Sequence, residues 1–275
     1  MAYTSASGPI YAGIFKKTAH VFIESGQSNS QGRGLLADSP IADGSLVGSV
    51  KTWRRNINGG DMYSGAGAWY GLEYDTNQYE ARNEFGSVLK FAMNLRDNLE
   101  DADNGIYIIK ADGNGKDIDG WLLGGDDENE RTAMYAGHIT PALASLVSLV
   151  NDGTYNEIRI HGFFWDQGEG DSSLQVKADA YQANLTTHIA DVRAAVGIPT
   201  LPFIMRRMES SFYTYTSTVQ SAQEAVAAAD ARVSIINGPW TYTDTIHIDG
   251  TSQNSVGDAR YTLLNSMTQG QVYNG

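Results

Sequence analysis

The stretch Val21-Phe22-Ile23-Glu24-Ser25-Gly26-Gln27-Ser28-Asn29-Ser30 begins with apolar residues and ends in a glycine followed by small polar residues. The apolar run predicts a short buried strand, and Gly26 with the residues after it predicts a sharp turn at the end of that strand. A serine in such a turn is lifted off the sheet, where backbone N–H groups can face a developing negative charge. Ser28 is therefore a candidate nucleophile, although serines in turns are more often structural.

Strands and helices alternate along the rest of the chain. Core strands are predicted near 19–24, 106–110, 157–165, 201–206 and 233–237, and helices near 85–99, 132–150, 174–195, 217–229 and 255–267. This alternation predicts an α/β fold, a three-layer α/β/α sandwich around a mainly parallel five-stranded sheet. Ligands bind such sheets beyond the carboxyl ends of the strands, which is where the turn with Ser28 is expected.

A second candidate segment lies near the end of the chain, in Tyr242-Thr243-Asp244-Thr245-Ile246-His247-Ile248-Asp249-Gly250. His247 can accept the proton of a serine hydroxyl and return it to a leaving alcohol, while a carboxylate holds the imidazole in the required tautomer. Asp244 suits that role by its spacing, and Asp249 is a second candidate. Taken alone, such a pair is more often a surface histidine in a loop and an aspartate that caps a turn or a helix.

A third segment, residues 158–171, passes from apolar residues into Trp165-Asp166-Gln167-Gly168-Glu169-Gly170-Asp171. The polar residues begin where the predicted strand should end. In order, the chain thus carries Gly26-Gln27-Ser28-Asn29, Trp165-x-Gln167-Gly168-Glu169-x-Asp171 and Asp244-x-x-His247. Together these blocks resemble those of the SGNH (GDSL-like) hydrolase superfamily, and within it the branch of sialate O-acetylesterases and carbohydrate esterase family six. The resemblance covers about residues 21–261.

The resemblance implies a flavodoxin-like SGNH hydrolase fold and a set of roles. Ser28 would be the nucleophile, His247 the general base and Asp244 the acid that orients it. The Gln167 amide would join the Ser28 backbone N–H in the oxyanion hole. Supporting positions are Gln27, Asn29 and Glu169, of which the glutamate is expected to order its loop. No cofactor and no metal is implied.

One oxyanion donor in this family is the backbone N–H of a glycine after the second core strand. Counting back from Trp121, Gly115 fits best, but the family usually has a Gly-Gly pair and a small hydroxyl residue where this chain has Asn114-Gly115-Lys116-Asp117. Gly113 is therefore a rival, and a plain turn is the simpler interpretation of both glycines. Ser30 stands where relatives often carry methionine and is not the expected nucleophile.

Four residues are candidates for substrate contact. Trp53 and Trp69 lie in an aromatic and glycine-rich segment, residues 51–84, which is predicted to be a long loop over the cleft. Its aromatic rings could stack on sugar faces, and a self-packed loop is the alternative. Trp121 is a third candidate. Arg206 could bind an anionic sugar, although a solvated or ion-paired arginine is the more common case.

Other chemistries have weaker support in the sequence. Glu169 and Asp171 lie too close on one loop to face each other across a glycosidic bond. The five histidines form no spaced ligand pair and cysteine is absent, so no metal site is predicted. His161 is expected in the core and His188 on the surface. No nucleotide-binding loop is present.

Composition limits the partners. A net charge of −13 argues against nucleic acid and anionic membrane surfaces as partners. No apolar run approaches the ~20 residues of a spanning helix. The 275 residues are expected to form a single domain, with 1–17 as an N-terminal extension. The first residues do not resemble a secretory signal, and neither the location nor the oligomeric state can be predicted.

The expected function is a serine esterase that removes O-acetyl groups from carbohydrates through an acetyl-serine intermediate, with an acetylated sugar or polysaccharide as the substrate. A general short-chain carboxylesterase is one alternative, and a series of acyl chain lengths would separate the two. A receptor-binding module of a phage tail that keeps the SGNH fold is another. The joint presence of Ser28, Gln167, Asp244 and His247 argues against a module that only binds.

Overall fold

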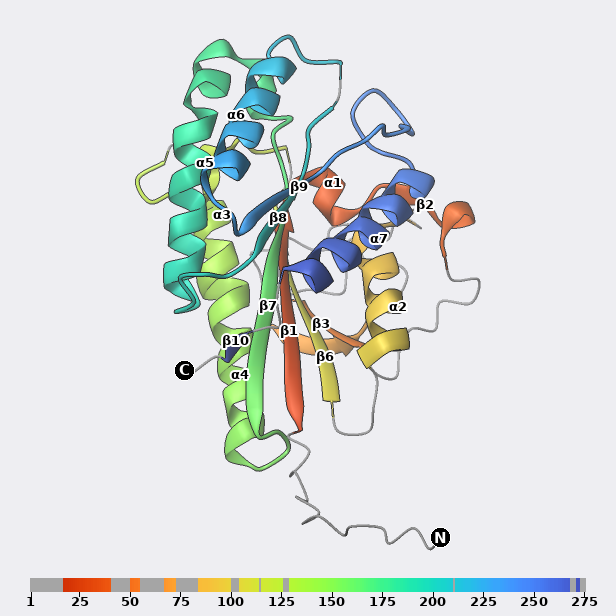
Figure 1. Ribbon diagram of the computed structural model, residues 1–275, viewed down its shortest axis with the longest axis vertical. Coiled ribbons are helices and arrows are strands. Elements are labelled where there is room, and N and C mark those ends of the chain that lie inside the picture. Colours follow the sequence, from red (N-terminus) through yellow and green to blue (C-terminus); the bar gives the residue numbers. More distant parts are fainter. Residues whose placement is uncertain are drawn as a thin grey trace, which may run out of the picture.

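One eight-stranded sheet forms the centre of the molecule in a computed structural model (Figure 1). The structure describes residues 17–40, 50–54, 67–72, 84–99, 104–113, 115–125, 129–209, 211–267 and 271–272. The strands of this sheet are β1 Thr18–Gly26, β3 Val50–Arg54, β4 Ala68–Gly71, β6 Asn104–Asp112, β7 Glu157–Asp166, β8 Phe203–Arg206, β9 Val233–Ile236 and β10 Gln271–Val272. A separate small sheet pairs β2 Gly34–Leu35 with β5 Glu84–Phe85.

The strand order places β1 at the point where the chain changes direction across the sheet. The order is β4-β3-β6-β1-β7-β8-β9, and β10 pairs with β7 off this path. From β3 to β9 all neighbours are parallel, whereas β4 and β10 are antiparallel to their partners. Because β6 and β7 flank β1 on opposite sides, the loops at their carboxyl ends diverge there and leave a crevice.

Helices cover both faces of the sheet. Their bounds are α1 Ser28–Gln31, α2 Ser87–Leu99, α3 Asn129–Thr132, the π-helical segment η3 Ala133–Ile139, α4 Thr140–Asn151, α5 Gln175–Ala195, α6 Thr216–Ala229 and α7 Gly250–Ser266. Short 3-10 turns are η1 Leu36–Asp38, η2 Ile118–Trp121 and η4 Asp171–Ser173. Figure 1 shows α4 and α5 on one side of the strands and α2 and α7 on the other.

Alternating side chains of β1 supply the two halves of the core. Val21 and Ile23 point into a cluster that includes residues of α4, α5 and α6, whereas Phe22 points into a cluster with α2 and α7. A strand that is buried on both faces has a nearly continuous apolar sequence, as this one does. The predicted α/β/α sandwich is confirmed, as are its five core strands and its five main helices.

The segment 51–84 differs from the prediction. Two of its parts are strands of the central sheet, because β3 pairs in parallel with β6 and β4 pairs with β3. Alternation in Val50-Lys51-Thr52-Trp53 is compatible with a strand, but the many glycines and polar residues around it favoured a loop. The sheet is correspondingly larger than the five strands predicted. Residues 55–66 and 73–83 of this segment, and residues 1–16 of the expected N-terminal extension, lie outside the described residues.

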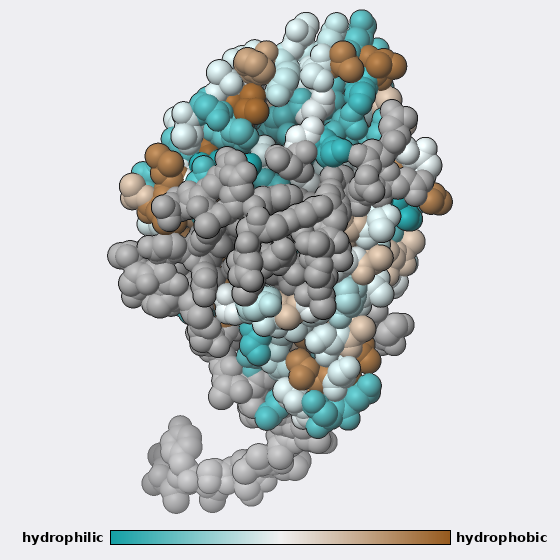
Figure 2. Space-filling view, turned by 180° about the vertical axis from the view of Figure 1, so that it is seen from behind, coloured by the Kyte–Doolittle hydropathy of each residue, from teal (hydrophilic) through white to brown (hydrophobic). Residues whose placement is uncertain are grey.

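One helical stretch, Ala133–Asn151, is long and apolar enough by length and composition alone to cross a membrane, with a mean hydropathy of 1.4. This differs from the prediction that no apolar run approaches such a length. In the structure its buried residues, including Leu143 and Leu146, pack against the sheet. On the back of the molecule, the described residues show hydrophobic side chains in small groups among hydrophilic ones (Figure 2).

Candidate active site

The turn after β1 carries Ser28 on the first position of the short helix α1. Gly26 ends the strand with a φ of 144°, and any Cβ at this position would overlap the Asp166 carbonyl. The close approach is held by a hydrogen bond of 3.0 Å from the Gln27 N–H to the Asp166 carbonyl oxygen. Only glycine adopts this backbone without strain, so the sharp turn that lifts Ser28 off the sheet depends on Gly26.

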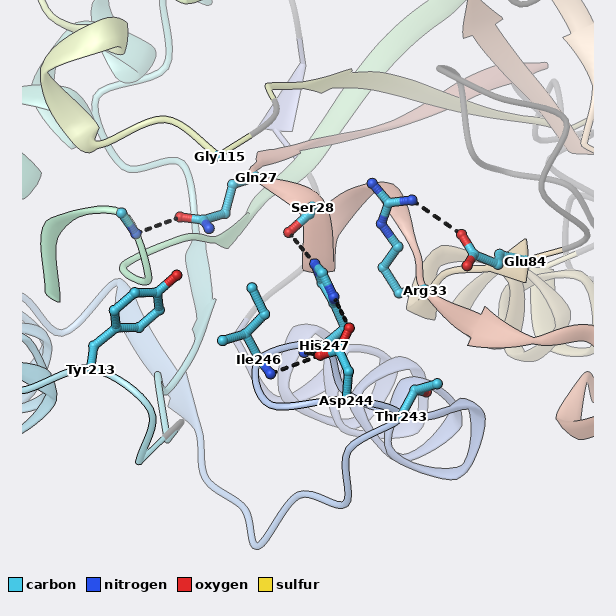
Figure 3. A pocket seen from close by; sticks show the side chains of 11 residues that line it. Gln27, Ser28, Arg33, Glu84, Gly115, Tyr213, Thr243, Asp244, Ile246 and His247 are labelled. Carbon is cyan, nitrogen blue, oxygen red and sulfur yellow. Dashed lines mark hydrogen bonds and ion pairs between the residues drawn. The ribbon is translucent and has the colours of Figure 1, made fainter. Parts of the chain in front are cut away.

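Ser28, His247 and Asp244 form a continuous chain of contacts (Figure 3). The Oγ atom of Ser28 lies 2.9 Å from Nε2 of His247, and Nδ1 of the same ring lies 2.6 Å from Oδ2 of Asp244. The other oxygen of Asp244 accepts the backbone N–H groups of Ile246 and His247, both at 2.8 Å. Asp244 and His247 lie three positions apart in one loop, whereas Ser28 is 219 positions from His247 and meets it only in the folded chain.

The charge of Asp244 fixes the tautomer of His247. Partial burial raises the pKa of this carboxyl, but hydrogen bonds from the His247 side chain and from the two backbone N–H groups outweigh burial, so the pKa lies below its usual value. An ionised Asp244 accepts the proton on Nδ1, which leaves Nε2 free to accept from the Ser28 hydroxyl. The rival carboxylate, Asp249, instead caps α7 by accepting the Ser252 N–H at 2.8 Å.

Asn29 joins the turn that carries Ser28 to the loop that carries His247. Its Nδ2 donates to the Ile246 carbonyl oxygen at 3.0 Å, and its Oδ1 accepts the Ile248 N–H at 3.0 Å. These two bonds hold the residues on both sides of His247. The same Nδ2 donates to Glu169 at 2.7 Å, so one buried amide connects all three motif blocks.

Buried ion pairs at the carboxyl ends of β7 and β8 stabilise the turn that carries Glu169. Arg206 binds Asp166 and Glu169, each at 2.6 Å, and all three side chains are almost fully buried. Burial by itself lowers the pKa of Arg206, but the two carboxylates outweigh this effect and raise it. Glu169 thus orders its loop, as the resemblance implied, while also holding Asn29.

A second buried cluster lies beneath α1. Lys110 contacts Glu24 at 3.0 Å and Asp112 at 2.6 Å, and it also donates to the Ser30 carbonyl oxygen. Burial lowers the pKa of Lys110, and the attraction of Asp112 and Glu24 more than reverses this. Burial raises the pKa of Asp112 to about 7, against the lowering effect of Lys110. Ser30 donates its hydroxyl to Asp112 and so faces away from the pocket.

The oxyanion candidates are placed differently by the structure. Gly115 lines the same pocket as Ser28, whereas the Gly113 N–H is bonded to the Gly26 carbonyl oxygen at 2.7 Å. Gln167 is buried, and its amide donates to Asp171 at 2.6 Å and to the Lys116 carbonyl oxygen at 3.1 Å. Its amide hydrogens are therefore not turned toward the pocket, which differs from the predicted placement.

Gln27 occupies the pocket instead. Its Oε1 accepts the N–H groups of Gly168 and Gly170 at 3.4 and 3.3 Å, and the other end of its amide faces the pocket (Figure 3). These two bonds fix the Gly168–Gly170 turn to the turn that carries Ser28. Gln27 stands directly before Ser28 in the first motif block, so its placement follows from the same turn.

None of the four candidates for substrate contact is among the described residues that line the pocket. Trp121 is fully buried with its ring against Trp165, at a centroid distance of 5.1 Å. Arg206 is buried in the ion pairs described above. Trp53 is buried in the sheet and packs edge to face on Trp69, at 5.2 Å, and neither lines the pocket. Large aromatic side chains gain most from burial, which outweighs any advantage of exposure at this site.

The pocket has a volume of about 300 Å³, and six of the residues that line it were not predicted as site residues. They are Arg33, Glu84, Gly170, Tyr213, Thr243 and Ile246. Arg33 and Glu84 lie on one side of Ser28 and Tyr213 on the other (Figure 3). Gly170, Thr243 and Ile246 lie in or next to the motif blocks, whereas no motif marks Arg33, Glu84 or Tyr213, which only their proximity to Ser28 in the fold identifies.

The remaining histidines serve the core. His161 contacts His20 at 2.8 Å within the sheet, as expected for a histidine inside a strand. His188 was predicted on the surface but is fully buried against Phe163 and Trp165, and burial lowers its pKa to about 3. Within the described part of the chain, no group of three or more histidine or acidic side chains could hold a metal ion.

The fold is a three-layer α/β/α sandwich, and its pocket lies at the carboxyl ends of the parallel strands. Residues 18–264 match the family model described as carbohydrate esterase, sialic acid-specific acetylesterase, and the chain belongs to this family. It is accordingly a carbohydrate esterase. No curated protein matches the chain.

Solved structures share the fold at low sequence identity. A protein from Arabidopsis thaliana has a TM-score of 0.66 at 20% identity, over 90% of this chain and 98% of that one. NanS has a TM-score of 0.62 at 13% identity, over 91% and 98%. A carbohydrate acetylesterase from Xanthomonas citri has a TM-score of 0.58 at 20% identity, over 89% of this chain and 55% of that one.

Proposed function

We propose that this carbohydrate esterase is a serine O-acetylesterase that removes acetyl groups from sugar hydroxyls. The observation that carries the proposal is the chain of contacts from Ser28 to His247 to Asp244, at 2.9 and 2.6 Å, which opens into a single pocket. A serine hydroxyl bonded to a correctly oriented imidazole is an activated nucleophile.

The reaction proceeds in two halves. Oγ of Ser28 attacks the acetyl carbonyl carbon while its proton passes to Nε2 of His247, which gives a tetrahedral oxyanion. The intermediate collapses as the bond to the sugar oxygen breaks, and that oxygen takes the proton from His247. Water then attacks the carbonyl carbon of the acetyl-serine while one of its protons passes to Nε2 of His247. The second intermediate collapses as the bond to Oγ of Ser28 breaks, Oγ takes the proton from His247, and acetic acid leaves and ionises to acetate. Throughout, Asp244 stays ionised and stabilises the imidazolium.

Backbone N–H groups are the proposed oxyanion donors. Ser28 is the first residue of α1, where the N–H has no acceptor within the helix. Gly115 lines the pocket, and with the Gly113 N–H occupied it is the better placed of the two glycines. Each such donor typically contributes about 10²–10³ in rate.

The size of the pocket supports a short acyl group. About 300 Å³ has to hold both the acyl chain and part of the sugar, which lies at the small end of the range for ligand sites. The alternative of a general short-chain carboxylesterase has the same catalytic residues and differs in the alcohol it accepts.

Hydrolysis of p-nitrophenyl esters from acetate to octanoate tests the proposal. We expect the highest kcat/KM with acetate and a loss of at least ~10⁴-fold in kcat for Ser28→Ala. Circular dichroism would check that the variant is folded, and Ser30→Ala is the matched control, since Ser30 faces Asp112. A folded Ser28→Ala enzyme with full activity would contradict the mechanism. Equal kcat/KM for p-nitrophenyl acetate and acetylated sugars would favour the general esterase.

A further inference from the structure

The charges around the pocket limit which sugar it can hold. Among the described residues that line it, one cation, Arg33, stands with two carboxylates, Glu84 and Asp244. The carboxylates therefore outnumber the cation, and the whole chain carries a net charge of −13. A bound carboxylate would meet repulsion from the site and from the surrounding field of the protein.

Arg33 is already paired. Its Nη1 contacts Glu84 at 3.2 Å and its Nη2 donates to the Gln31 side-chain oxygen at 3.3 Å, so each terminal nitrogen has a protein acceptor. Both partners of the ion pair are largely buried, with side chains 9% and 18% exposed. An anionic ligand would have to compete with Glu84 for the guanidinium group, and displacing Glu84 would leave that carboxylate partly buried without its partner.

Two further arginines of the described residues, Arg206 and Arg207, are neutralised as well. Arg206 is enclosed by Asp166 and Glu169, as described above. Arg207 contacts Glu224 at 2.8 Å and Glu209 at 3.3 Å. Each of these three arginines is thus matched by at least one carboxylate.

The opposite wall of the pocket suits an uncharged sugar. Tyr213 lines the pocket and turns its hydroxyl toward it (Figure 3). No hydrogen bond of this hydroxyl to another described residue is formed, so it can bond a ligand. The phenol is also a neutral donor at working pH, because burial and the nearby charges of Glu169 and Asp244 raise its pKa.

The backbone holds Tyr213 in place. Its carbonyl oxygen accepts the Thr216 hydroxyl at 2.9 Å, and the N–H of Tyr215 donates to Ser172 at 3.1 Å. The neighbouring Phe212 packs edge to face on the Tyr213 ring at 4.9 Å and is itself 60% exposed. A fixed aromatic ring with a free hydroxyl offers an apolar face for the C–H groups of a pyranose and a donor for one of its oxygens.

We propose that the pocket takes a neutral, hydroxyl-bearing pyranose lying against Tyr213 and discriminates against sugars that carry a carboxylate. The proposal rests on the acetylesterase function and names its substrate class. It differs from the sialic acid specificity in the family's description, since sialic acid is an anion.

Two matched substrates test the discrimination: the 3-O-acetyl esters of methyl glucoside and of methyl glucuronide, which differ by one carboxylate. We expect kcat/KM to be at least about 10-fold higher for the glucoside at low ionic strength, and the difference to shrink in 0.5 M salt. Glu84→Gln, which leaves Arg33 without its carboxylate, should reduce the preference several-fold. Glu224→Gln removes an exposed carboxylate outside the pocket and is the control that should leave the preference unchanged.

Binding measurements keep this proposal separate from the mechanism. In the Ser28→Ala protein, isothermal titration with the same two esters gives Kd values without any turnover. We expect tighter binding of the glucoside, a roughly 10-fold weaker Kd when Tyr213→Ala is added, and a smaller loss with Tyr213→Phe. Equal or tighter binding of the glucuronide, or an unchanged Kd with Tyr213→Ala, would overturn the proposal even if Ser28 proves to be the nucleophile. Loss of turnover alone would concern the mechanism only.

Discussion

The centre and the edge of the sheet use their polar and aromatic side chains in opposite ways. At the carboxyl ends of β1 and β7, buried charges and one amide, Asn29, tie three turns together beside an open pocket. At β3 and β4, Trp69 packs edge to face on both Trp53 and Tyr107, and none of these rings is among the described residues that line the pocket. At the carboxyl ends of β1 and β7, hydrogen bonds orient the side chains, whereas at β3 and β4 packed aromatic rings fill the core. Substitutions should therefore affect chemistry at the first region and stability alone at the second.

The largest effect on stability is expected at the centre. Arg206→Ala leaves Asp166 and Glu169 buried without their cation, which costs about 3–5 kcal/mol. Arg207→Ala, one residue away, removes a more exposed ion pair and should cost about 0–1 kcal/mol. Urea unfolding of the two variants measures the difference. Similar losses for both would show that burial does not distinguish these neighbouring arginines.

At the edge of the sheet, Trp53→Ala should cost about 3–5 kcal/mol through the cavity it leaves. The KM for an acetylated sugar should stay at the wild-type value at a temperature where the variant is folded, because Trp53 does not line the pocket. Thermal unfolding and steady-state kinetics measure the two effects. A several-fold rise in KM with little loss of stability would show that Trp53 contacts substrate, which would contradict the distinction drawn between the centre and the edge of the sheet.

Asn29→Ala removes the two hydrogen bonds that hold the residues on both sides of His247. We expect kcat for p-nitrophenyl acetate to fall by about 10–100-fold, as for a small misplacement of a catalytic group. Asn94→Ala is the control, since that amide bonds Asp258 on the surface. An unchanged kcat would mean that Asp244 alone is enough to position the histidine.

The last prediction concerns the pH dependence of stability. Burial raises the pKa of Asp171 to about 7, although bonds from Gln167 and the Ile118 N–H act against it. The folded state therefore binds a proton more tightly than the unfolded state, so stability is highest below about pH 4 for this group and falls as pH rises to about 7. Asp171→Asn should flatten that part of the curve of unfolding free energy against pH. If the unfolding free energy of Asp171→Asn still falls with pH as in the wild type, the fall would be due to Asp112, whose pKa is also about 7.

Much of this molecule was predictable from local sequence. The apolar runs of β1, β6 and β7 exceed what a half-buried strand needs, so they mark a parallel sheet covered on both faces. Gly26 before Ser28 marks the sharp turn, because the backbone there accepts no side chain. The spacing of Asp244 and His247 allows their contact within one loop, independent of the rest of the fold.

Other features depend on contacts between distant segments. The sequence identifies Trp53, Trp69, Trp121 and Arg206 as large or charged side chains near motif blocks, but it does not show which neighbours enclose them. Arg206 is buried because Asp166 and Glu169, 40 and 37 residues away, neutralise it. His188 is buried because its helix places it against Phe163 and Trp165 of β7.

The sequence by itself determined the α/β order and the sharp turn at Ser28, since each follows from periodicity or from the conformational limits of a few adjacent residues. Only the tertiary structure decided that Gln27 rather than Gln167 faces the pocket, that Arg33 is paired with Glu84, and that Tyr213 forms the opposite wall. The physical reason is that burial and charge pairing are set by neighbours in space, and those neighbours come from segments far apart in the chain.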